Sequence, residues 1–102
     1  MIRKGRPYKE VRQEVLQDPV VASRYLQEAL KESLTAFQKA LFVVAQARQI
    51  SEVAKSAGVQ RETLYHALSE DGNPTLQTLA SVLDAVGLRL SVESKAAPPS
   101  GH

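Results

Sequence analysis

The side chains with the clearest capacity for recognition chemistry lie between residues 60 and 69. They are polar or aromatic, and helical spacing would place them on the exposed side of a short helix: Gln60, Arg61, Glu62, Tyr65, His66 and Ser69. The residues expected to hold the other side against a core are Val59, Leu64, Ala67 and Leu68. An arginine presented in this way can donate two hydrogen bonds to the O6 and N7 atoms of a guanine. We therefore interpret this segment as a helix that contacts the edges of DNA bases.

The stretch from residue 50 to residue 69 predicts two short helices joined by a tight turn. The first helix is expected to begin at an N-cap Ser51 and to end at Gly58, where the turn needs a positive φ that glycine adopts at little cost. The second helix is expected over about residues 61–69. Ala54 is small, as required where two helices cross closely. This arrangement is the helix-turn-helix, which places its second helix in the major groove of DNA.

Three residues near this motif are candidates for contacts with the DNA backbone. Thr75 is expected to cap the next helix, whose free N–H groups favour a phosphate. Ser51 and Lys55 lie on the first helix of the motif and are further candidates. No metal ligand set accompanies them, because His66 is the single histidine of this segment and the chain has no cysteine.

Two helices are expected before the motif. Asp18 followed by Pro19 is typical of a helix start, with an N-cap and a first-turn proline. Thr35 and Gln38 have the spacing of a capping box, so the second helix is expected to begin there and to end near Gln49.

The chain after the motif predicts one more helix and then a strand. Thr75 is expected to begin the helix and Gly87 to end it, and its expected inward residues are Leu76, Leu79, Ala80 and Leu83. Apolar and polar residues then alternate, as in a strand with an apolar face formed by Leu88, Leu90 and Val92. A lone strand needs a partner, and we expect the same segment of a second copy, giving a homodimer that binds an inverted-repeat operator. A protein partner on the strand edge, or a dimer formed through the first helices, is the alternative.

These elements predict an all-α domain of five helices with a short C-terminal β-strand, over residues 18–93. Residues 1–17 are interpreted as a basic arm, since residues 1–12 carry five cations against one acid and the chain as a whole carries only +2. The arm is expected to follow phosphates or enter a minor groove, or else to add solubility or contact a protein. Residues 94–102 are expected to be a disordered tail.

The composition argues against several classes of function. The chain has no cysteine, no paired carboxylates and no glycine-rich phosphate loop, so we expect neither an enzyme nor a bound cofactor or metal. It has no apolar stretch long enough to cross a bilayer and no secretory signal, so we expect a cytoplasmic protein without membrane contact.

Several blocks of the sequence resemble the addiction-module antidote proteins, HigA-like antitoxins of the Xre/Cro-repressor superfamily. The resemblance covers about residues 6–92, and its most specific blocks are Arg61-Glu62-x-Leu64-Tyr65-x-Ala67-Leu68-Ser69 and Gly72-Asn73-Pro74. It implies an Xre/Cro-like fold and a DNA-binding antitoxin that represses its own operon and neutralises a RelE/ParE-like toxin. Two alternatives stay open: a stand-alone transcriptional regulator without a toxin, and a helical module that binds protein.

Overall fold

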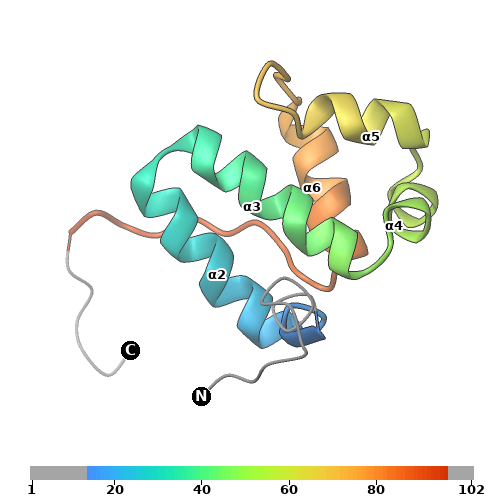
Figure 1. Ribbon diagram of the computed structural model, residues 1–102. Coiled ribbons are helices and arrows are strands. Elements are labelled where there is room, and N and C mark those ends of the chain that lie inside the picture. Colours follow the sequence, from blue (N-terminus) through green and yellow to red (C-terminus); the bar gives the residue numbers. More distant parts are fainter. Residues whose placement is uncertain (1–13, 97–102) are drawn as a thin grey trace, which may run out of the picture.

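The computed structural model describes residues 14–96, and helices account for most of them. In chain order these are α2 (Pro19–Glu32), α3 (Leu34–Ala47), α4 (Ile50–Ala57), α5 (Arg61–Ala67) and α6 (Leu76–Ala85). Figure 1 shows α2 and α3 running in opposite directions, with the three shorter helices gathered around the second half of α3. None of the helices within residues 14–96 is long and apolar enough to span a membrane.

Two predicted helix starts are confirmed. The side chain of Asp18 accepts a hydrogen bond from the backbone N–H of Val20 at 2.9 Å, and Pro19 occupies the first turn of α2. Thr75 Oγ1 accepts from the backbone N–H of Thr78 at 3.0 Å and so caps α6. Each of these bonds satisfies one of the N–H groups that a helix start leaves without a partner inside the helix.

Two other predicted starts are wrong, each by two residues. Ser33, rather than Thr35, caps α3, since its hydroxyl accepts from the N–H of Ala36 at 2.9 Å. Ser33 is the single residue between α2 and α3, so it is already extended at the point where the chain reverses. The helix α4 begins at Ile50 instead of after Ser51, because buried Ile50 belongs to the core and Gln49 turns the chain with a φ of 75°.

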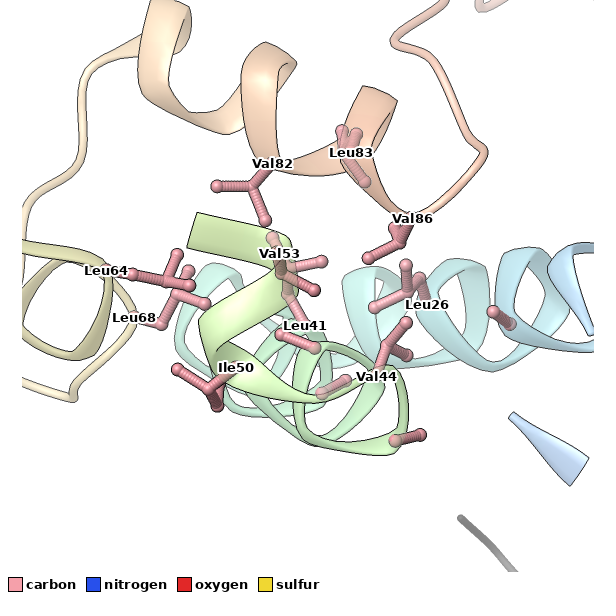
Figure 2. Close-up of a cluster of buried hydrophobic side chains, with 14 of the residues drawn as sticks. Leu26, Leu41, Val44, Ile50, Val53, Leu64, Leu68, Val82, Leu83 and Val86 are labelled. Carbon is pink, nitrogen blue, oxygen red and sulfur yellow. The ribbon is translucent and has the colours of Figure 1, made fainter. Parts of the chain in front are cut away.

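The core is built from every helix, as Figure 2 shows for the side chains around α4. Leu41 and Val44 of α3 and Val53 of α4 are fully or almost fully buried there, together with Leu64 of α5 and Val82 of α6. Burying such side chains is the main favourable term in folding, at roughly 25 cal/mol per Å² of apolar surface. The position of each short helix is therefore set by the residues it contributes to this common core.

The folded part of the chain begins before the expected boundary at residue 18. Leu16 is buried in the same core, and Gln17 Nε2 donates a hydrogen bond to the backbone oxygen of Ala47 at 2.9 Å. The cations expected to form the basic arm precede these residues and lie, like the end of the tail at 97–102, outside the residues that the structure describes.

One predicted inward residue and the predicted strand are not found. Leu76 is 69% exposed, because it opens α6 and the packing of that helix on the core starts with Leu79. No strand occurs within residues 14–96, and the segment 88–92 has no ladder partner there. Alternating residues define a strand only when a second strand accepts its hydrogen bonds, and the described chain supplies none.

Gly58 and Gly72 flank the α5 segment for different physical reasons. Gly58 caps α4 with a φ of 78° and has open space around it, so it is needed for its conformation alone. A Cβ atom at Gly72 would overlap the backbone oxygens of His66 and Ala67, the second at 2.6 Å, so this glycine is needed for close approach to the end of α5.

We therefore expect Gly72→Ala to lower the free energy of unfolding by about 2–3 kcal/mol, as overpacking against rigid backbone does. Gly58→Ala is the matched control and should cost about 1 kcal/mol, the penalty of a left-handed alanine. Urea denaturation of both variants measures the difference. An equal or smaller loss for Gly72→Ala would contradict the close-approach argument.

Candidate nucleic-acid interface

The helix α5 is short, and its apolar side is fixed to the core. Leu64 and Ala67 are buried within the helix, and Leu68 is buried directly after it. The turn from α4 is tight, since the N–H of Val59 donates to the oxygen of Ala54 at 3.0 Å across Gly58. A helix of seven residues is too short to be stable alone, so its direction depends on these contacts.

The opposite side of α5 is exposed, as the sequence predicts. The residues placed there or at its two ends are Gln60, Arg61, Glu62, Tyr65, His66 and Ser69, all of them exposed. Gln60 precedes the helix without a capping bond from its side chain. Ser69 lies beyond the last helical residue, and its hydroxyl donates back to the oxygen of His66 at 2.8 Å. Ser69 is thus engaged in ending α5, whereas the side chains of the others make no hydrogen bond within residues 14–96.

An aromatic contact organises the exposed side of α5. The guanidinium of Arg61 lies over the ring of Tyr65, with 5.7 Å between its Cζ and the ring centroid. The ring of Tyr65 in turn lies 5.5 Å from that of Phe42 on α3, tilted by 54°. These are the distances of a cation–π pair and of an aromatic pair. Phe42 was missed by the sequence analysis, although an aromatic residue beside the apolar stripe of α3 is a signal for such a contact.

A second contact from α3 holds the end of α5. Gln38 Nε2 lies within hydrogen-bond distance of the backbone oxygens of Ala67 (3.2 Å), Ser69 (3.2 Å) and Gly72 (3.3 Å). The oxygen of Ala67, at the end of α5, has no partner inside the helix and needs one from elsewhere, whereas that of Ser69 also accepts from the N–H of Gly72 at 2.9 Å. The predicted capping-box role of Gln38 is therefore wrong, because its side chain is used on α5 and the following loop instead of on its own helix.

The candidates for DNA-backbone contacts lie on two further elements. Ser51 and Lys55 are exposed on α4, and Thr75 is exposed at the start of α6. Thr75 Oγ1 already accepts from the N–H of Thr78 and lies 3.0 Å from its hydroxyl, so it serves as a cap in this structure. The expected dimerisation residues differ in exposure, since Leu88 packs partly on the core while Leu90 and Val92 are 43% and 96% exposed.

Residues 10–94 match a protein family described as "Probable addiction module antidote protein". The chain belongs to this addiction-module antidote family. A protein of Haemophilus influenzae, itself described as uncharacterized, is 43% identical to it over 70 residues, which are 68% of this chain and 72% of that protein. No solved structure matches the chain. The resemblance to antidote proteins is thus confirmed, and the family assigns an antitoxin role with a toxin as the general partner, while its HigA-like detail stays a prediction.

The ion pair Lys39–Glu70 ties α3 to the loop after α5 and allows a test of this geometry. Lys39 Nζ lies 2.7 Å from Glu70 Oε2, and this hydrogen bond and positive charge lower the pKa of Glu70 below its ordinary value. We expect Lys39→Ala to return that pKa to the ordinary range, as measured by an NMR titration of the Glu70 carboxyl group. The pair contributes stability above the unfolded pKa of Glu70, and this is lost as the pH falls through the lowered value.

The matched control is Lys31→Ala, which removes an exposed lysine paired with Glu28 on α2. It should leave the pKa of Glu70 unchanged. An unchanged pKa in Lys39→Ala as well would mean that the ion pair does not form in solution.

Proposed function

We propose that this antidote-family chain binds operator DNA through α4 and α5, represses its own operon and neutralises a RelE/ParE-like toxin. The observation that supports DNA binding is the amphipathic character of α5. Its apolar side is fixed to the core through Leu64, while its exposed side presents Arg61 and its neighbours to solvent. A seven-residue helix held in this way after a tight glycine turn has the form of the second helix of a helix-turn-helix.

The side chains of α5 suggest how bases would be contacted. Arg61 is the candidate for a bidentate contact to guanine, and Glu62 could accept from a cytosine amino group or orient Arg61. Tyr65 and His66 follow on the same exposed side and are candidates for further base or backbone contacts. Ser51, Lys55 and Thr75 would supply contacts to the phosphates and set the register of the helix in the groove.

The segment after α6 supports the proposal that the DNA-binding form is a homodimer. No hydrogen bond joins residues 89–93 to the rest of the described chain, although Leu88 anchors the start of the segment beside α2. The backbone N–H and C=O groups of residues 89–93 are therefore available to a partner, and the side chains of Leu90 and Val92 in the same segment expose apolar surface. A second copy would pair with it as an antiparallel strand about a two-fold axis. Two α5 helices would then meet half-sites about 34 Å apart in an inverted repeat.

The DNA-binding part is tested with DNA taken from upstream of the gene. We expect Arg61→Ala to weaken binding to this DNA by about 1–3 kcal/mol in a gel shift and to change binding to unrelated DNA much less. Arg24→Ala is the matched control, because it removes the same charge from the exposed side of α2. Equal losses on both DNAs would assign Arg61 to the phosphates, and no binding of the unaltered protein to either DNA would refute the proposal.

The antitoxin part is tested by expressing the protein encoded by the neighbouring gene. If that protein is the toxin, it should arrest growth alone, and co-expression of this chain should restore growth and yield a complex that copurifies. A neighbouring product that is harmless and does not copurify would favour a stand-alone regulator instead.

The dimer is tested by Val92→Asp, which places a charge on the apolar face of the segment. Because Val92 is almost fully exposed, the substitution should not affect the free energy of unfolding of a single chain. We expect sedimentation to show a shift from dimer to monomer, and operator affinity to fall with it. Leu76→Asp is the control for oligomeric state, since Leu76 is also exposed but lies at the start of α6. A Val92→Asp protein that stays a tight dimer would exclude this segment as the seam.

A further inference from the structure

The side of α3 that faces α5 carries two residues one helical turn apart. Gln38 reaches the backbone oxygens at the end of α5, and Phe42 contacts the ring of Tyr65 in its middle. Residues four apart on a helix lie on the same face, so both act from one strip of α3. This strip supports α5 at two points, in addition to the anchoring of its apolar side by Leu64.

The ring of Tyr65 links Phe42 to the guanidinium of Arg61, the group proposed to contact guanine. Arg61 and Tyr65 are four residues apart on α5, which allows the guanidinium to lie over the ring at 5.7 Å. Tyr65 is 39% exposed, so one part of its ring faces solvent and another part faces Phe42. An exposed arginine otherwise samples many rotamers, and ordering it on contact with a base has an entropic cost.

We propose that Phe42 is a positioning residue for base recognition: through the ring of Tyr65 it fixes the direction of the Arg61 side chain before DNA is bound. The proposal rests on the proposed DNA-binding function. Phe42 itself lies on α3, half-buried, and need not touch DNA. Its effect should therefore fall on the preference for the operator, where a bidentate contact needs a defined direction, and not on the attraction to phosphates, which does not.

The variant that tests this is Phe42→Leu, which keeps an apolar side chain but removes the ring. We expect operator affinity to fall about two- to fivefold, the range of an exposed cation–π contact, with affinity for unrelated DNA unchanged. Phe42→Tyr keeps a ring and should restore the operator preference. In an Arg61→Ala background, Phe42→Leu should cause no further loss of preference, because the group that it positions is gone.

Phe37→Leu is the matched control. Phe37 is also half-buried on α3 and packs on the core, and the same substitution there should lower stability without changing the operator preference. Thermal unfolding of both variants separates loss of stability from loss of preference. If the two variants lower operator affinity equally, Phe42 only contributes packing and the proposal is wrong.

A measurement on the free protein separates this proposal from the function on which it rests. The ring of Tyr65 shifts the side-chain proton resonances of Arg61 upfield when the guanidinium lies over it. We expect Phe42→Leu, but not Phe37→Leu, to move these resonances toward the values of an unstructured arginine. Unmoved resonances in Phe42→Leu would overturn the positioning role even if the protein binds its operator. If instead the unaltered protein shows no operator preference, the proposed function fails, whereas moved resonances would still establish that Phe42 orders Arg61.

Discussion

The burial of Leu64 is the interaction on which the candidate site depends. This side chain has no exposed surface, and it belongs to a helix of only seven residues. Such a helix does not form alone, because nucleation fixes several residues before hydrogen bonds repay the lost entropy. The core therefore supplies both the stability and the direction of α5. Gly58 before the helix and Gly72 after it allow the chain to approach and leave this anchor within a few residues.

Local signals in the sequence were sufficient where a single residue decides a helix boundary. Asp18 with Pro19, Gly58 and Thr75 act through their own side chains or φ angles, and each was assigned its observed place. The start of α3 was assigned wrongly. Ser33 and Thr35 are both good caps, and only the reversal of the chain after α2 selects Ser33. At α4 the burial of its first residue outweighed a local cap, at the cost of a positive φ at a non-glycine residue.

The parts of the site that the sequence did not indicate are contacts between distant segments. The exposed face of α5 follows from helical spacing, but the approach of Gln38 to Ala67 spans 29 residues of chain. For residues 88–92 the sequence made the opposite error, because the alternation of apolar and polar residues predicted a strand that is not found within residues 14–96. Its period is correct for a strand, yet a strand exists only in relation to a partner, and the described chain holds none. The periodicity and composition of a segment can be read from its own residues. Strand pairing and side-chain contacts such as that of Phe42 with Tyr65 also depend on a second segment, which the pattern of the first does not identify.

The small net charge of the chain makes the orientation of individual side chains important for the proposed DNA binding. The chain carries +2 overall and its first twelve residues carry +4, so the remainder is weakly acidic at −2. A body of this kind attracts phosphates only weakly, and sequence-independent binding depends mainly on that attraction. Preference for one operator over other DNA must then come from a few directed contacts. Arg61 is suited to this because the contact of its guanidinium with the Tyr65 ring favours one direction of the side chain before DNA is bound. A weakly acidic domain is thus compatible with selective recognition, provided that its few base-contacting groups are ordered in advance.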